Sequence, residues 1–229
     1  MIIHPASAVF FDMDGVLIDS EPVWQEAIVS TFGRLGITLD AAMQEHLAGM
    51  GNVESVQYVL GRNPGVRADV RELCGQLDAH VLCRIGEGIG AIPGAEALVR
   101  ALAGGGVPLA LVSTSGPALM AAVVRANRWS GLFRVVLSSE EVGPGKPDPA
   151  VYCEAVRRMQ ADASRSLAIE DTVNGARSAQ GAGLPVIGLT RDACVAAAME
   201  PLVWQVVPDY TALTSLVQKR FERRPERGA

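Results

Sequence analysis

The hydrophobic pattern of this chain begins with a short continuous run. Residues Ala8 to Phe11 are all apolar, and Asp12 ends the run abruptly. A run of this length without polar alternation is typical of a strand that is buried on both faces of a sheet. We therefore predict a buried parallel strand whose carboxyl end carries Asp12.

From Pro93 onward, similar runs alternate with segments in which apolar residues recur at helical spacing. Strands that alternate with helices indicate a parallel sheet with helices on both faces. The predicted fold class is therefore α/β, with a Rossmann-like parallel-sheet core. The expected strands span residues 107–112, 135–137, 167–169, 185–189 and 204–207, and the expected helices span residues 95–102, 117–126, 148–159, 173–182 and 211–221.

The segment from Ser20 to Gly90 has helical spacing and contains no convincing buried strand. Asp40 suits the N-cap of its second helix. We therefore predict an all-helical domain, residues 20–90, inserted after the first strand of an α/β core domain, residues 1–19 and 91–229. Three expected helices in this insertion span residues 21–35, 54–60 and 69–85. A fourth begins after Asp40, carries Met43 and Leu47, and ends near Gly49 to Gly51.

Composition narrows the class of protein. The chain has 229 residues, 49% of them hydrophobic, which is enough for one large domain or two small ones. The formal net charge of -5 argues against a nucleic-acid partner, because nucleic-acid-binding domains usually present a basic face. No stretch is long and apolar enough to span a bilayer, and acidic residues interrupt the first apolar run. We expect a soluble cytoplasmic protein with no membrane partner.

The cysteines are scattered along the chain. They form no Cys-x-x-Cys pair and no cluster with histidine at the spacing of zinc ligands, so the sequence predicts neither a zinc site nor a disulfide framework. We expect reduced, mostly buried thiols. The four residues are Cys74, Cys83, Cys153 and Cys194.

Two acidic residues follow the first predicted strand. Asp12 ends the strand, Asp14 comes two residues later, and Gly15 allows a sharp turn or a close approach to a ligand. In open α/β sheets, ligands bind beyond the carboxyl ends of the strands, which is where these carboxylates would lie. The alternative interpretation is that both aspartates only hydrogen-bond a turn.

Polar residues also follow three later strands. Ser113 and Thr114 directly follow the strand at 107–112. Hydroxyl side chains at this place are also common in ordinary turns. Lys146 lies in the string Gly143–Pro149, in which two glycines and three prolines restrict the backbone around one ammonium group. Glu170 and Asp171 end the strand at 167–169, and they could simply cap the next helix.

The strings around these residues, taken in order, resemble the four motifs of the haloacid dehalogenase superfamily. Its β-phosphoglucomutase-like branch of sugar-phosphate phosphatases has a helical cap domain at the place of residues 20–90. The resemblance implies that Asp12 is the nucleophile and that Asp14 is the general acid and base. It implies further that Lys146 offsets negative charge and that Ser113 and Thr114 bind the substrate.

The same resemblance implies a magnesium site. Its expected ligands are Asp12, Asp14, Glu170 and Asp171. Charge supports this expectation, because ionised Asp12, Glu170 and Asp171 add about -3, Lys146 adds +1, and a phosphate monoester brings about -1.5 to -2. A pocket with this balance would repel its substrate unless a cation such as Mg²⁺ were bound.

The expected function is hydrolysis of a phosphomonoester through an aspartyl-phosphate, with a small phosphorylated metabolite such as a sugar or polyol phosphate as the partner of a monomeric enzyme. A phosphomutase is the nearest alternative. The mutases have a histidine where this chain has Trp24, and an arginine in a turn where this chain has Asn52 and no arginine. The resemblance makes Trp24 and Asn52 candidate substrate-binding residues of the cap, although Trp24 could also be a core residue and Asn52 a helix N-cap. A catalytically silent binding protein on the same fold is a further alternative.

Overall fold

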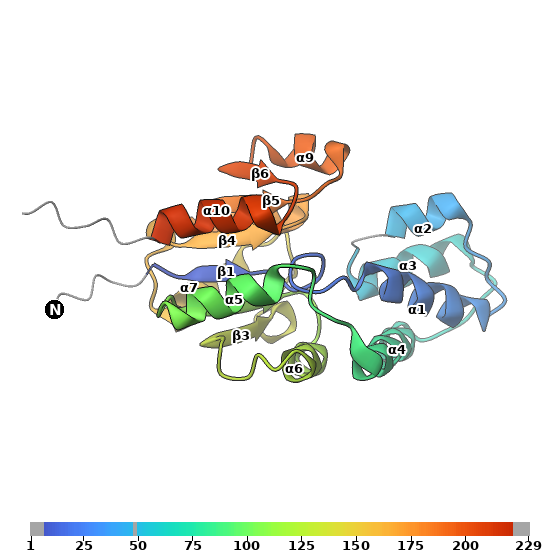
Figure 1. Cartoon of the computed structure of the whole chain (residues 1–229). Coiled ribbons are helices and arrows are strands. Elements are labelled where there is room, and N and C mark those ends of the chain that lie inside the picture. Colours follow the sequence, from blue (N-terminus) through green and yellow to red (C-terminus); the bar gives the residue numbers. More distant parts are fainter. Residues whose placement is uncertain (1–6, 48–49, 222–229) are drawn as a thin grey trace, which may run out of the picture.

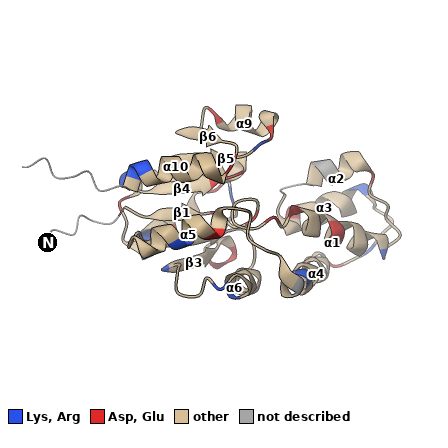
Figure 2. Ribbon diagram, viewed as in Figure 1, with Lys and Arg blue, Asp and Glu red and all other residues tan. Residues whose placement is uncertain are grey.

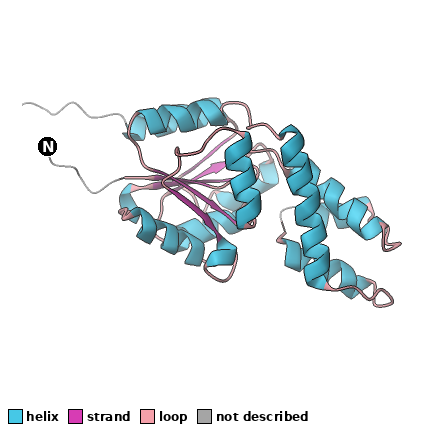
Figure 3. Cartoon of the chain, turned by 90° about the horizontal axis from the view of Figure 1, so that it is seen from below, coloured by secondary structure: helices cyan, strands magenta, loops and turns pink. Residues whose placement is uncertain are grey.

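The computed structural model describes residues 7–47 and 50–221. A parallel sheet with helices on both sides lies at one end of the molecule, and a separate group of helices lies beyond the carboxyl ends of the strands (Figure 1, Figure 3). The chain leaves the sheet after the first strand, forms this helical group, and then returns to complete the sheet.

The sheet has six parallel strands in the order β3-β2-β1-β4-β5-β6. β1 lies in the middle, where Phe10 pairs with Ala110 on one side and with Ala168 on the other. Because the strand order reverses beside β1, a crevice forms beyond its carboxyl end. The strands are β1 (Val9–Phe11), β2 (Leu109–Ser113), β3 (Val135–Ser138), β4 (Leu167–Glu170), β5 (Val186–Leu189) and β6 (Gln205–Val207).

Alternate residues of β1 face two different hydrophobic cores, as the twofold period of a strand requires. Val9 and Phe11 pack into the core under α5, α6 and α10, whereas Ala8 and Phe10 pack into the core under α7, α8 and α9. The sheet is therefore buried on both faces, which explains the uninterrupted apolar run. These helices are α5 (Ala95–Gly104), α6 (Pro117–Ala126), α7 (Ala150–Met159), α8 (Val173–Gly181), α9 (Ala193–Met199) and α10 (Tyr210–Phe221).

The helical group consists of α1 (Glu21–Gly33), α2 (Ala41–Leu47), α3 (Asn52–Arg62) and α4 (Val70–Gly88). Apolar residues of these helices, including Phe32, Val59 and Leu77, are fully buried against one another. α4 also packs against α6 of the sheet region. Asp40 and Asp69 accept hydrogen bonds from the first turns of α2 and α4, so both act as N-terminal caps.

The two connections between the sheet and the helical group lie side by side. Ile92 N donates to Leu17 O over 2.9 Å, and Ile18 forms a bridge with Ala91. Tyr210, at the start of α10, donates its hydroxyl hydrogen to Val16 O over 2.6 Å. The loop that follows β1 is thus held by the returning connection at Ala91 and Ile92 and by Tyr210 of α10.

The predicted fold class is confirmed, and most predicted elements differ from the observed ones only at their ends. The helix α9 and two short 3-10 turns, Ser139–Glu141 and Ala163–Arg165, were not predicted. α9 has a single fully buried residue, Met199, so its sequence carries no strong helical stripe. The expected end of α2 near Gly49 lies outside the described residues.

The exposure of the cysteines and the length of the helices bear on two further expectations. The cysteines form no disulfide, but the expectation of mostly buried thiols is wrong, because three are exposed and Cys74 is half-buried. Three of them occupy outward positions on α4, α7 and α9, where helical spacing and not residue type sets exposure. None of the helices in the described part of the chain is both long and apolar enough to cross a bilayer.

Candidate active site

The site begins where β1 ends. Asp12 N donates to Ile169 O over 3.1 Å, so the backbone of Asp12 continues the ladder between β1 and β4. The Asp12 side chain is buried, and its Oδ1 accepts a hydrogen bond from Lys146 Nζ over 2.5 Å. The central strand therefore presents a carboxylate, already paired with an ammonium group, at the carboxyl edge of the sheet.

The loop after Asp12 packs tightly against the next acidic strand end. Gly15 has a φ of 75°, and a Cβ atom at this position would lie 1.9 Å from Asp171 Oδ2. Gly175 plays the matching part for Glu170, since a Cβ there would lie 1.8 Å from Glu170 Oε2. Two glycines thus leave the space that the two carboxylates fill.

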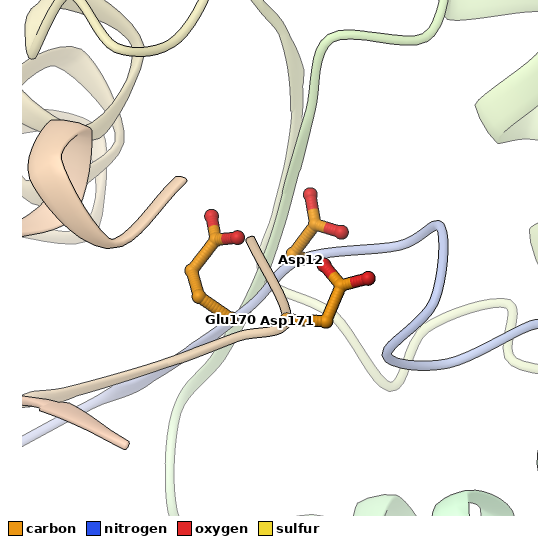
Figure 4. Close-up of side chains that lie close together, drawn as sticks. All are labelled: Asp12, Glu170 and Asp171. Carbon is orange, nitrogen blue, oxygen red and sulfur yellow. The ribbon is translucent and has the colours of Figure 1, made fainter. Parts of the chain in front are cut away.

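Asp12, Glu170 and Asp171 form a carboxylate cluster. One oxygen of each lies within 4.8 Å of the others. Figure 4 shows the three side chains rising from adjacent strand ends, with the carboxylates of Asp12 and Asp171 close to each other. The sheet order brings them together, because β1 and β4 are neighbours although the residues are far apart in sequence.

Lys146 and Tyr152 hold one oxygen of Glu170. Glu170 Oε1 accepts from Lys146 Nζ over 2.6 Å and from Tyr152 Oη over 2.5 Å. Lys146 Nζ also donates to Val112 O over 3.2 Å, so its ammonium group is fully engaged. Glu170 Oε2 is buried and has no hydrogen-bond partner.

The cluster holds more negative charge than its one lysine can balance. Burial raises the pKa of Asp12 to about 8; Lys146 opposes this rise, whereas Glu170 and Asp14 add to it. Burial, together with Asp12 and Glu170, also raises the pKa of Asp171 well above its ordinary value. Burial lowers the pKa of Lys146, but the two adjacent carboxylates outweigh this effect and raise it above the ordinary range.

The residues present fit a magnesium ion. Hard divalent cations prefer oxygen ligands, and this cluster offers three carboxylates and one buried oxygen, Glu170 Oε2, that lacks a partner. A divalent cation would also remove the charge imbalance that disfavours ionised Asp12 and Asp171.

Asp14 lies in a different environment. Its Oδ1 accepts from Ser20 Oγ over 2.5 Å, and its Oδ2 accepts from Ser115 Oγ over 2.8 Å and from Ser113 Oγ over 3.2 Å. The carboxylate of Asp14 does not belong to the cluster of three. Its predicted role as a metal ligand therefore stays a prediction.

A cavity of about 750 Å³ lies between the sheet edge and the helical group. Lys146 and three of the carboxylates, Asp12, Asp14 and Asp171, line it. Among the predicted substrate-binding residues, Thr114, Trp24 and Asn52 also line the cavity, whereas Ser113 is buried behind it.

Asn52 does not serve as an N-cap. It is the first residue of α3, Gly51 is the N-cap, and Asn52 Nδ2 donates to Asp78 Oδ1 over 2.8 Å. Trp24 is half-buried and packs against the core of the helical group as well as lining the cavity. Both the core interpretation and the substrate-binding interpretation of Trp24 are thus compatible with its position.

Sequence reasoning missed three residues of the site. Ser20 and Ser115 hold Asp14, and they occur within strings already considered at the ends of the first two strands. Tyr152 carried no local signal, because it lies inside α7 and contacts Glu170 only through the packing of that helix on the sheet.

The geometry agrees with the sequence profile that the chain matches. Residues 6–183 match the profile of the haloacid dehalogenase-like hydrolases, which is more than half of the chain. The chain therefore belongs to this family of hydrolases.

Individual relatives share about 30% sequence identity with this chain. The 6-phosphogluconate phosphatase of Escherichia coli strain K12 is 30% identical over 212 residues, which cover 91% of this chain and 92% of that protein. The bifunctional riboflavin kinase/FMN phosphatase of Arabidopsis thaliana is 29% identical over 185 residues, 80% of this chain, and the chain spans only 48% of that protein's length.

Among solved structures, CbbY from Rhodobacter sphaeroides in complex with phosphate superposes with a TM-score of 0.76. It is 25% identical in sequence, and the superposition covers 91% of this chain and 96% of that one.

Proposed function

We propose that this protein is a Mg²⁺-dependent phosphomonoester hydrolase that acts on a small sugar or polyol phosphate through an aspartyl-phosphate. The observation that carries the proposal is the position of Asp12. It ends the central strand, pairs with Lys146, stands beside two further carboxylates, and lines a cavity of ligand size. The names of the relatives, which include several phosphatases, support the reaction class.

The proposed chemistry has two steps. Asp12 attacks the phosphorus atom, and the P–O bond to the leaving alcohol breaks while Asp14 donates a proton to that oxygen. In the second step Asp14 accepts a proton from water, which attacks phosphorus and releases phosphate and free Asp12. The hydroxyl group of Thr114, which lines the cavity, would donate to a phosphoryl oxygen, and the positive charge of Lys146 would offset the charge of the phosphoryl group.

Asp12, Glu170 and Asp171 would hold the magnesium ion, with Asp14 as the remaining predicted ligand. When bound, the ion supplies positive charge that offsets the carboxylates and the phosphoryl group. The ammonium group of Lys146 orients both Asp12 and Glu170, because it donates to each of them.

The helical group serves in this proposal as a cap domain, residues 20–90, over a core domain formed by residues 1–19 and 91–229. Two observations support this division. The paired connections at Leu17–Ile92 and Ile18–Ala91 lie at the proposed boundaries, and the cavity takes its lining from both parts. Closure of the cap would exclude water while the first step takes place.

Phosphate release tests the proposal. Purified protein is incubated with sugar, polyol and nucleotide monophosphates and with phosphoglycolate, first with Mg²⁺ and then with EDTA. Release from a few related esters with Mg²⁺, lost with EDTA, is the expected result. Mass spectrometry of rapidly quenched enzyme should show one added phosphoryl group on the peptide that contains Asp12, and none in Asp12→Asn.

A mutase assay on β-glucose 1-phosphate distinguishes the proposed hydrolase from its nearest alternative, a phosphomutase. Isomerisation without net phosphate release would identify a phosphomutase and would contradict the hydrolase proposal. Neither release nor isomerisation in the presence of Mg²⁺ would favour a binding protein. The monomeric state and the cytoplasmic location stay predictions from the sequence.

A further inference from the structure

The lining of the cavity beyond Asp12 and Lys146 is rich in amide and carboxylate side chains. α1, α2 and α3 contribute the amide side chains of Gln25, Gln44 and Gln57 to its lining. Three carboxylates also line the cavity, Glu21 on α1, Glu54 on α3 and Glu140 in the 3-10 turn after β3. Figure 2 shows acidic residues at the beginning of α1, the end of that helix nearest the sheet.

Positive charge is confined to the phosphate end. Among the described residues that line the cavity, Lys146 is the only lysine or arginine. Its ammonium group already donates to Asp12, Glu170 and Val112 O. No cationic side chain in the described lining is therefore left to pair with a second anionic group of a substrate.

Carboxylates from the two parts of the molecule also approach each other beside the cavity. Burial raises the pKa of Asp78 on α4, and the charge of Glu140 adds to this rise. Asn52, which lines the cavity, donates to Asp78 and partly offsets this effect. Carboxylates of both the helical group and the sheet region therefore add negative potential beside the cavity.

We propose that the leaving group of the substrate is an uncharged polyhydroxyl group, and that Glu54 and Glu140 select sugar or polyol monophosphates against esters with a second phosphate or a carboxylate. This inference rests on the proposed phosphatase activity. Hydroxyl groups can donate to the carboxylates and accept from the amides, so a neutral polyol leaves few polar groups of the lining unpaired. Trp24 offers an apolar surface to the carbon skeleton.

A second anion would meet carboxylates without a counter-ion, and like charges placed together in a partly enclosed site disfavour binding. The relative in Escherichia coli is named for 6-phosphogluconate, an ester that carries a carboxylate. We therefore expect this chain to differ from that relative in substrate preference.

Two open-chain esters that differ at one carbon provide the test. Sorbitol 6-phosphate ends in a hydroxymethyl group where 6-phosphogluconate ends in a carboxylate. We expect kcat/KM with Mg²⁺ to be at least about tenfold higher for sorbitol 6-phosphate. In Glu54→Gln and Glu140→Gln the ratio should fall, by on the order of threefold each. Glu72→Gln, an acidic residue of α4 outside the lining, should leave the ratio unchanged.

The outcomes separate the two proposals. Phosphate release that is equal for both esters, or faster for 6-phosphogluconate, would overturn the charge selection and leave the phosphatase assignment intact. No release from any ester would overturn the phosphatase assignment. Thermal-shift titration of the wild-type protein with the same two esters then measures the charge preference alone, and tighter binding of 6-phosphogluconate would refute it.

Discussion

Three serine hydroxyl groups surround the carboxylate of Asp14, the residue that we propose as the general acid and base. Ser20 directly precedes α1, and Ser113 and Ser115 lie at the end of β2. Together they donate to both oxygens of Asp14. They orient the carboxylate at the cavity wall, apart from the cluster of Asp12, Glu170 and Asp171. This separation favours a proton-transfer role for Asp14 and a nucleophilic role for Asp12.

Asp14→Asn should lower kcat by roughly 10²–10⁴-fold, because the amide cannot donate a proton to the leaving oxygen or accept one from water. 4-Nitrophenyl phosphate has a leaving group that needs no proton. With this ester, the rate of the first step should fall far less in Asp14→Asn. Rapid-quench measurement of the phosphorylated enzyme separates this step from hydrolysis. Asp19→Asn, at an exposed residue outside the cavity, is the matched control. An equal loss of the first step with both kinds of ester would argue against general acid catalysis.

Tyr152→Phe should destabilise the protein, because it removes a hydrogen bond to the buried carboxylate of Glu170. A hydrogen bond to a charged group contributes about 1.5–3 kcal/mol to the free energy of unfolding. Urea denaturation followed by circular dichroism measures the change. Tyr58→Phe, at a half-buried residue of α3 that packs on His46, should change the free energy by less than about 0.5 kcal/mol. Equal stability of Tyr152→Phe and the wild type would show that this hydrogen bond makes no net contribution.

At the scale of elements, the loop between β1 and α1 is the part that the rest of the site depends on. It presents Asp12 and Asp14, and Gly15 lets it approach Asp171. Its conformation is held by Ile92 and by Tyr210, which come from the returning connection and from α10. Because both partners lie outside the loop, the positions of Asp12 and Asp14 depend on correct packing of distant elements.

Gly15→Ala tests this close approach. The substitution adds backbone strain of roughly 1–2 kcal/mol at a positive φ and places a methyl group where Asp171 Oδ2 lies. Gly36→Ala is a matched control, since Gly36 has a φ of 74° and no heavy atom would lie within 4 Å of the added Cβ. We expect both variants to lose stability in thermal denaturation, and Gly15→Ala to lose more because its methyl group also displaces Asp171. Only Gly15→Ala should lose Mg²⁺ binding and phosphatase activity, and retention of both would show that Asp171 can move aside without consequence.

At the scale of the whole molecule, the structure joins a stable sheet to a helical group through two neighbouring connections. The cavity between them is lined by residues that follow the strands of the sheet and by residues of α1, α2 and α3. If the proposed function is correct, this arrangement places the reacting groups in the sheet region and part of the substrate-selecting lining in the helical group.

Mg²⁺ should stabilise the folded protein, because only the folded chain brings Asp12, Glu170 and Asp171 together. At a Mg²⁺ concentration 100 times its dissociation constant, the free energy of unfolding would rise by about 2.7 kcal/mol. Differential scanning fluorimetry with MgCl₂, compared with NaCl at equal ionic strength, measures it as a rise in Tm. Asp171→Ala should abolish the rise, whereas Asp192→Ala, which removes the cap of α9, should lower Tm but keep the response to Mg²⁺. An undiminished rise in Asp171→Ala would remove Asp171 from the ligand set.

The sequence by itself determined the strand and helix pattern and the residue types at the strand ends. Both are local properties: buried strands must be continuously apolar, and glycine, proline and carboxylate residues mark where they end. Asp12, Lys146, Glu170 and Asp171 can therefore be singled out from local sequence patterns alone.

Only the tertiary structure decided which groups meet. That Ser115 and Ser20 hold Asp14, that Tyr152 supports Glu170, and that Ser113 is buried behind the cavity depend on the register of β1 against its neighbours and on the packing of α7. The charge of the cavity beyond the phosphate site likewise depends on how α1 and α3 face the sheet. Such contacts join residues far apart in sequence, and no periodicity or motif within one segment encodes them.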